Sequence, residues 1–112
     1  MTVTSQSVSA AVAVANLDDL PVGESMTVDL PGQPRIAIFN TADGVYAIDD
    51  TCTHQDASLA DGWVEDCAVE CPLHEACFDL RTGVPNGPPA KTPVRTHDAQ
   101  VVDGHIFLTP SA

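Results

Sequence analysis

The sequence predicts an all-β fold, an antiparallel β-sandwich scaffold with a loop-rich subdomain inserted into it. Three observations lead to this prediction: short segments that alternate apolar and polar residues, two Asp-Gly turn signals between such segments, and no sustained helical periodicity. Nine prolines and seven glycines also favour turns over long helices. The 112-residue chain has the length of one domain with one modest core, and we predict a single domain over residues 1–112.

The scaffold strands are expected on both sides of the insertion. Residues 26–30 alternate apolar with polar side chains, and a polar turn over residues 16–21 separates them from an N-terminal strand. Asp43-Gly44 and Asp103-Gly104 are each flanked by apolar segments, which is typical of β-hairpins. The predicted strands span residues 11–15, 26–30, 35–40, 45–49, 100–102 and 106–108.

Residues 50 to about 90 form a different kind of segment, with little strand alternation. This segment contains all four cysteines, the single tryptophan and a Gly-Pro-Pro run at residues 87–89. A structureless connection of about forty residues is uncommon in a compact domain unless a function organises it. We therefore predict that this insertion carries the functional site.

The chain is strongly acidic. Sixteen Asp and Glu residues against four Lys and Arg residues give a formal net charge of −12. Nucleic acid and anionic membranes are not expected as partners, because both require a basic surface. No Lys or Arg lies between Arg35 and Arg81. The acidic residues of this interval predict a solvated surface that keeps the protein in solution. The alternative is an acidic collar that steers the protein onto basic partners. This acidic collar comprises Asp43, Asp49, Asp50, Asp56, Asp61, Glu65, Asp66, Glu70, Glu75 and Asp79.

Targeting signals are not evident in the sequence. No stretch approaches the ~18 consecutive apolar residues that a bilayer-spanning helix needs. Residues 1–15 lack the basic start of a signal peptide, so we expect a cytoplasmic protein. Because the cytoplasm keeps thiols reduced, the four cysteines are expected as metal ligands or buried thiols rather than as disulfides.

Two short motifs in the insertion predict a metal centre. Cys52-Thr53-His54 and Cys71-Pro72-Leu73-His74 each supply one thiolate and one imidazole, and sixteen residues separate them. Thiolates are soft ligands that suit iron–sulfur clusters or zinc, and imidazole suits either metal. Structural zinc also accepts two cysteines and two histidines, but zinc sites more often pair two cysteines in one motif, whereas each motif here mixes the two residue types.

These motifs resemble those of the Rieske family. The resemblance implies one [2Fe-2S] cluster per chain, with Cys52 and Cys71 on one iron and His54 and His74 on the other. Pro72 also matches the second motif of the family. The Gly-Pro-Pro run at residues 87–89 lies where the family has a proline-containing loop over the cluster.

Departures from the respiratory members of the family imply a low reduction potential. Those proteins carry two further cysteines, joined as a disulfide, where this chain has Ala57 and Leu73. They also carry a Ser and a Tyr that donate hydrogen bonds to sulfur, where this chain has Ala76 and Phe78. Because such hydrogen bonds stabilise the reduced cluster, their absence predicts a potential near the low end of the Rieske span, about −150 mV.

The chain is most similar to the ferredoxin components of bacterial ring-hydroxylating dioxygenase systems, such as those for biphenyl, toluene or carbazole. The length and the run Phe78-Asp-Leu-Arg-Thr-Gly83 carry this resemblance. It implies a monomeric electron carrier, not an enzyme, between a flavin-containing NAD(P)H reductase and a terminal Rieske oxygenase. Glu75 stands where the family usually has Gly. Two alternatives stay open, the small subunit of an assimilatory nitrite reductase and a zinc-stapled binding module.

Other chemically distinctive residues are expected to be structural. Cys67 and Cys77 are predicted to be buried or half-buried thiols. His97 and His105 are predicted to be ordinary strand residues near the C-terminal hairpin. Trp63 is predicted to pack in the core beneath the cluster-binding loops.

Overall fold

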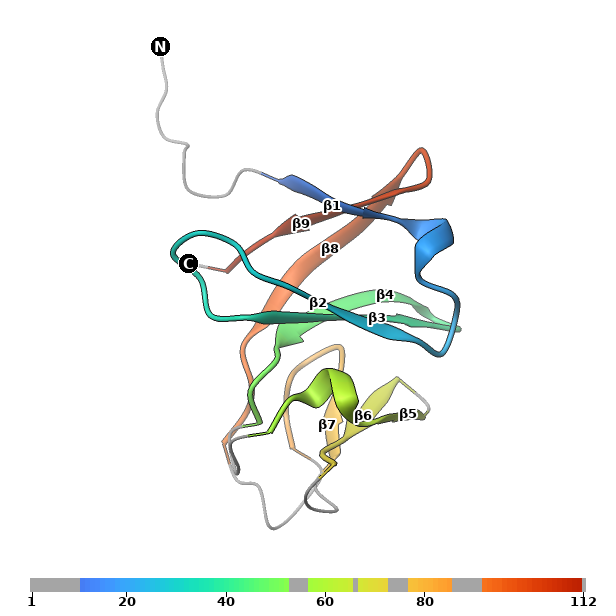
Figure 1. Cartoon of the computed structure of the whole chain (residues 1–112). Coiled ribbons are helices and arrows are strands. Elements are labelled where there is room, and N and C mark those ends of the chain that lie inside the picture. The colour runs from blue at the N-terminus through green and yellow to red at the C-terminus, as the bar shows by residue number, and fades with distance from the viewer. Residues whose placement is uncertain (1–10, 53–56, 66, 73–76, 86–91, 112) are drawn as a thin grey trace.

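A computed structural model describes residues 11–52, 57–65, 67–72, 77–85 and 92–111 of the chain, and these residues form an antiparallel β protein (Figure 1). Regular helix is limited in this part to two short 3₁₀ turns, Leu17–Asp19 and Leu59–Asp61. No helix of the described residues is long and apolar enough to cross a membrane. The strands are β1 (Val12–Asn16), β2 (Ser25–Val28), β3 (Ile36–Thr41), β4 (Gly44–Asp49), β5 (Trp63–Glu65), β6 (Ala68–Glu70), β7 (Cys77–Asp79), β8 (Thr96–Val102) and β9 (His105–Thr109).

Six of the strands form one curled sheet in the order β1-β9-β8-β4-β3-β2. Strands β4 and β8 pair over only two positions, so the sheet folds over at this junction into two facing halves (Figure 1). The apolar side chains between the halves form the first core, and their burial stabilises the sandwich. This core comprises Leu20, Ile36, Ile38, Ala47, Ile106 and Leu108.

Strand β3 links this core to a second one. All six of its residues are buried, and successive side chains point to opposite faces. Ile36 and Ile38 lie in the sandwich core, whereas Ala37 and Phe39 belong to the core beneath the inserted segment. The scaffold and the insertion therefore share β3 as a common wall.

Both predicted hairpins are confirmed, with one correction to the turn. Between β8 and β9, Asp103 and Gly104 have φ values of 52° and 76°, as a type I′ turn requires. Between β3 and β4, the register pairs Thr41 with Gly44, so the two turn residues are Ala42 and Asp43. Gly44 is thus the first residue of β4 and not a turn residue.

The inserted segment contains a small sheet that the sequence did not predict. Strands β5, β6 and β7 pair in that order as an antiparallel three-stranded sheet, which lies below the β2–β3–β4 half in Figure 1. Each strand has only three residues, which is too short for an alternating pattern to be recognised.

Candidate metal centre

The first ligand-bearing loop follows β4 and is closed by backbone hydrogen bonds. Thr51 and Ser58 form an isolated antiparallel bridge. Inside it, the Cys52 amide donates to the Ala57 carbonyl over 2.9 Å. Cys52 itself is 3% exposed, so its sulfur faces the protein interior. Cys52, the first residue of the motif, is therefore fixed by backbone hydrogen bonds, whereas Thr53 and His54 lie outside the described residues.

Asp50 braces this loop from inside the protein. Its carboxylate accepts hydrogen bonds from the Ser58 hydroxyl at 2.8 Å and from the Ala60 amide at 2.9 Å. Asp50 is only 3% exposed, so its inclusion in a solvated acidic collar was wrong. Asp50 can be buried because its carboxylate accepts hydrogen bonds from polar groups of residues 58–60.

The second ligand-bearing loop begins at Cys71, directly after β6. Cys71 is fully buried and belongs to the same apolar cluster as Cys52, together with Leu59 and Phe78. The structure thus brings the two predicted thiolate ligands into one buried region. His54 and His74, the two predicted imidazole ligands, lie outside the described residues, as do Glu75, Ala76 and the Gly-Pro-Pro run.

The donor chemistry of this region fits an iron–sulfur cluster. Two cysteine sulfurs enclosed by aliphatic and aromatic side chains supply soft ligands in an apolar setting. Among the described residues, no group of three or more His, Cys, Asp or Glu could hold a metal ion. A metal centre on Cys52 and Cys71 would therefore take further ligands from beyond the described part, and the histidine of each motif is the nearest candidate along the chain.

The other two cysteines behave as predicted, as buried or half-buried thiols. Cys67 is 3% exposed and adopts a φ of 61° at the β5–β6 turn, where its carbonyl accepts the Leu80 amide. Cys77 is half-buried. Burial is the main cause that raises the pKa of its thiol, and the negative charges of Glu70 and Glu65 raise it further. All four cysteines are described, and no disulfide joins them.

Trp63 is not a core residue, and that prediction was wrong. Its side chain is 63% exposed. Trp63 pairs with Glu70 across the three-stranded sheet, whereas the neighbouring pair Val64 and Val69 supplies the side chains that face the core. The side-chain alternation along β5 therefore places the tryptophan on the solvent side.

The two C-terminal histidines lie in strands, as predicted. His105 begins β9. His97, in β8, is buried: its Nε2 lies 2.8 Å from an Asp49 oxygen, and its Nδ1 accepts the Ser111 amide at 2.9 Å. His97 thus ties β4, β8 and the C-terminal segment together.

A turn after β7 is hydrogen-bonded to the segment that leads into β8. The Gly83 amide donates to the Asp79 carbonyl at 2.7 Å, and the Gly83 carbonyl accepts the Val94 amide at 2.9 Å. Gly83 has a φ of +76°, and an added Cβ would lie 2.1 Å from the Val94 carbonyl oxygen. Glycine is therefore required here both for its backbone conformation and for the close approach.

These features define a small β protein with two buried cysteines on two loops, a donor set that fits a metal centre. The Rieske [2Fe-2S] domain matches residues 10–98, and the chain therefore belongs to this family. Membership implies one [2Fe-2S] cluster per chain.

The most informative relatives are ferredoxins. The 3-phenylpropionate/cinnamic acid dioxygenase ferredoxin subunit of Photorhabdus laumondii is 42% identical over 88% of this chain and 92% of its own length. The ferredoxin of carbazole 1,9a-dioxygenase from Nocardioides aromaticivorans has a TM-score of 0.84 at 37% identity, over 92% of this chain and 100% of that one. A ferredoxin chain from a complex with the oxygenase of carbazole 1,9a-dioxygenase has a TM-score of 0.81 at 31% identity, over 87% and 99%.

Nitrite reductase small subunits share the fold as well. One described as a putative NADPH nitrite reductase small subunit has a TM-score of 0.78 at 30% identity, over 88% of this chain and 97% of that one. The ferredoxin subunit of P. laumondii has a higher identity over a similar share of the chain. The nitrite reductase alternative is therefore the weaker of the two.

Proposed function

We propose that this protein is the ferredoxin of a ring-hydroxylating dioxygenase system and carries single electrons to its terminal oxygenase. The observation that carries the proposal is the pair of buried cysteines, Cys52 and Cys71, on two loops of a Rieske-family chain. The similarity to dioxygenase ferredoxin subunits over most of the chain supports the specific role. The protein is not itself an enzyme in this proposal, because redox chemistry on a substrate belongs to the partner.

The proposed ligand set is Cys52, His54, Cys71 and His74. The buried cysteines suit the iron that faces the protein, and the histidines of the same motifs complete the set. When bound, a cluster with these ligands accepts and returns one electron, and its two neutral imidazoles make it easier to reduce than a cluster with four thiolates. The chain itself contributes the enclosure, since Leu59, Phe78 and the two cysteines form one apolar cluster.

In this proposal the protein carries one electron at a time between a two-electron donor and the oxygenase. A flavin-containing reductase takes two electrons from NAD(P)H, which becomes NAD(P)⁺, and passes them on one at a time. Two ferredoxin molecules are therefore reduced for each NAD(P)H oxidised. Each reduced molecule gives its electron to the terminal oxygenase, a role supported by the solved complex of a similar ferredoxin with its oxygenase.

This role fits a single-domain monomer that is located in the cytoplasm, where NAD(P)H is available. The four cysteines, which form no disulfide, are consistent with that reducing compartment.

The proposal is tested by anaerobic titration of the purified protein with NADH in the presence of a trace of flavin-containing reductase from a 3-phenylpropionate/cinnamic acid dioxygenase system. We expect the visible absorbance to bleach, with about half an equivalent of NADH needed per chain. A protein that dithionite bleaches but that NADH and the reductase do not bleach would contradict the ferredoxin role. A colourless protein that contains zinc would contradict the cluster itself.

A further inference from the structure

The three-stranded sheet has one face in the core and one face in solvent. Directly opposed residues of antiparallel strands project to the same side. The central row of pairs, Val64–Val69–Phe78, faces the core. The rows on either side of it therefore project outward. This outer face consists of Trp63, Glu65, Ala68, Glu70, Cys77 and Asp79.

The outer face is hollowed, and apolar and acidic side chains are interleaved across it. Glu70 lies between Trp63 and Cys77, and Ala68 lies between Glu65 and Asp79. Together with the turn that follows β7, this face lines an open hollow of about 700 Å³. Trp63 is 63% exposed, and Val84, which also lines the hollow, is 50% exposed. A large aromatic side chain exposed beside other apolar groups is typical of a protein–protein contact, because tryptophan supplies much contact area with few rotamers.

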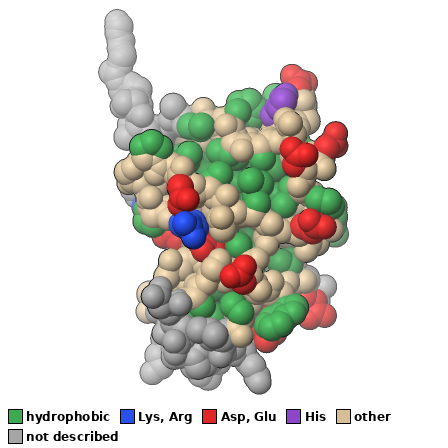
Figure 2. Space-filling model, in the orientation of Figure 1, with side chains coloured by type: hydrophobic (Ala, Val, Ile, Leu, Met, Phe, Trp, Pro, Cys, Tyr) green, Lys and Arg blue, Asp and Glu red, His purple; other side chains and the backbone are tan. Residues whose placement is uncertain are grey.

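The charged side chains that line the hollow are negative. Glu65, Glu70 and Asp79 are among its lining residues, and no Lys or Arg lines it within the described part of the chain. The arginines of the described part of the chain are already engaged in ion pairs elsewhere, and acidic side chains outnumber basic ones on the face shown in Figure 2. These pairs are Arg35–Asp29, Arg81–Asp43 and Arg95–Asp49.

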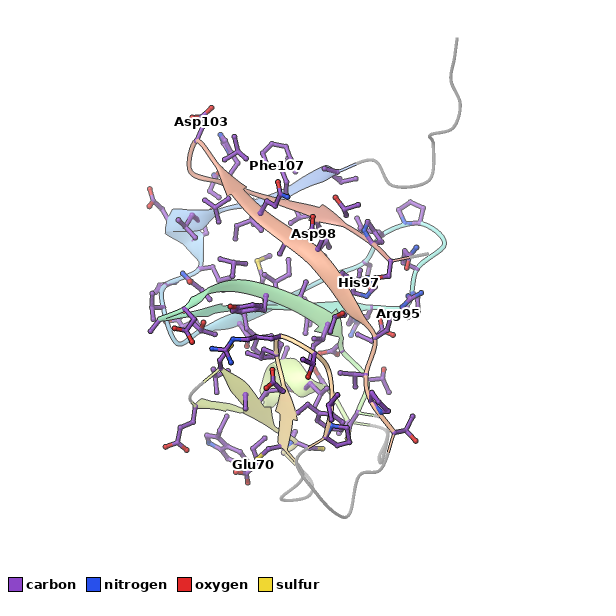
Figure 3. All side chains as sticks on the ribbon, turned by 180° about the vertical axis from the view of Figure 1, so that it is seen from behind. Glu70, Arg95, His97, Asp98, Asp103 and Phe107 are labelled. Atoms are coloured by element: carbon purple, nitrogen blue, oxygen red, sulfur yellow. The ribbon has the colours of Figure 1, made fainter. Side chains whose placement is uncertain are left out.

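The hollow lies next to Cys71, one of the proposed ligands. Glu70 directly precedes Cys71, and Cys77 follows His74 by three positions. Figure 3 shows Glu70 at the end of the molecule opposite Asp103, which lies in the β8–β9 turn. A partner bound at the hollow would therefore sit next to the cluster-bearing end of the protein and away from the far end of the sandwich.

We propose that the outer face of the three-stranded sheet is the docking surface for an electron-exchange partner whose contact surface carries lysine or arginine side chains beside apolar ones. Trp63 supplies the apolar contact. Glu65 and Glu70 attract the basic side chains and orient the encounter. This inference rests on the proposed function, since it specifies where and by what chemistry the electron carrier meets its partner.

Ferricytochrome c is a suitable probe, because lysines surround its exposed haem edge. The dithionite-reduced holoprotein, freed of excess dithionite, transfers one electron to one ferric haem, and stopped-flow absorbance at the haem band gives the rate constant. The test variant is the double substitution Glu65→Gln, Glu70→Gln. The control is Asp98→Asn, Asp103→Asn, which makes the same charge change on exposed residues of the sandwich (Figure 3).

We expect the glutamate variant to react about fivefold more slowly than the control variant at ionic strength near 0.01 M, where charges act over ~30 Å. The two variants should converge near 1 M salt, where that distance falls to ~3 Å. Equal rates for the two variants at low salt would overturn the inference.

The apolar contact has its own test. Trp63→Ala should lower the rate constant about tenfold at low salt and retain most of that loss at high salt, because apolar contact is not screened. Val101→Ala, which shortens an exposed side chain in β8, should leave the rate unchanged. A rate for Trp63→Ala equal to that of Val101→Ala would remove the tryptophan from the docking surface.

Two further readouts separate this inference from the proposed function. Ferricyanide, a small anion that needs no protein docking, should oxidise every variant as fast as the parent or faster. The reduction potential and iron content should match those of the parent, so that slow transfer reports docking and not a changed cluster. If the parent itself transfers no electron to either oxidant, the proposed function fails. If the parent reacts but the matched variants do not differ, only the docking surface fails.

Discussion

The scaffold and the inserted segment are stabilised by different kinds of interaction. Except for β2, which has four residues, the scaffold strands have five to seven residues, and tight hairpin turns join β3 to β4 and β8 to β9. The insertion has strands of three residues and depends on turns, a buried carboxylate and buried cysteines. Periodic burial of apolar side chains thus explains the first region, whereas specific chemistry at individual residues explains the second.

The largest effect should follow removal of a proposed ligand. Cys71→Ser should abolish the cluster, because serine is a much poorer ligand for iron than thiolate. Amide hydrogen exchange in β5, β6 and β7 should then accelerate strongly, since the metal centre joins the two loops of the insertion. Exchange in β8 and β9 should stay slow, because their pairing does not depend on the loops. Equal acceleration in both regions would show that the scaffold depends on the cluster as well.

The two cores provide a matched pair of core truncations. Leu59 and Leu108 are both fully buried, one beneath the insertion and one in the sandwich. Each Leu→Ala change should lower the free energy of unfolding by about 2–5 kcal/mol. Leu59→Ala should also speed iron loss to a chelator, because it opens a cavity in the cluster of side chains around Cys52 and Cys71. Equal iron-loss rates for the two variants would contradict a separate role for the second core.

Two glycines with the same φ of +76° separate backbone strain from close packing. Gly104→Ala, at the β8–β9 turn, adds a Cβ with no atom within 4 Å and should cost about 1 kcal/mol of strain. Gly83→Ala adds the same strain and a clash with the Val94 carbonyl, so its cost should be about 3 kcal/mol. Chemical denaturation of both variants checks the difference, and similar midpoints would mean that the clash relaxes.

The smallest effect is expected at the surface. Arg35 pairs with Asp29 at 3.1 Å, but both side chains are more than half exposed. Arg35→Gln should therefore shift the denaturation midpoint less than Gly104→Ala does, because exposed ion pairs are solvated and screened. A larger shift would indicate that this pair fixes the entry into β3.

The sequence predicted the scaffold well because its signals are local. Asp103-Gly104 needs only its own backbone preferences to form the turn that the structure shows. Strand β8, however, begins at Thr96 and not at residue 100. Its first half includes the buried His97, whose burial depends on Asp49 and Ser111, and sequence periodicity cannot reveal such tertiary partners.

The ligand motifs were recognisable because metal chemistry restricts residue type and spacing. Cys52 and Cys71 are buried together, as their motifs implied. The burial of Asp50 and the exposure of Trp63 were predicted wrongly, because both depend on loops and short strands that have no sequence pattern of their own. The assignment of Cys52, His54, Cys71 and His74 as cluster ligands and the low reduction potential stay predictions.

The proposed ligands Cys52, His54, Cys71 and His74 would hold a cluster that carries one electron. An EPR-monitored redox titration of the iron-reconstituted protein tests this ligand set. We expect a rhombic signal that appears on reduction, integrates to one spin per chain and has a midpoint of about −150 mV, at the low end of the Rieske span. Substitution of either histidine by cysteine should lower that midpoint or abolish the signal. An EPR-silent protein, or a midpoint unchanged by both substitutions, would rule out this ligand set.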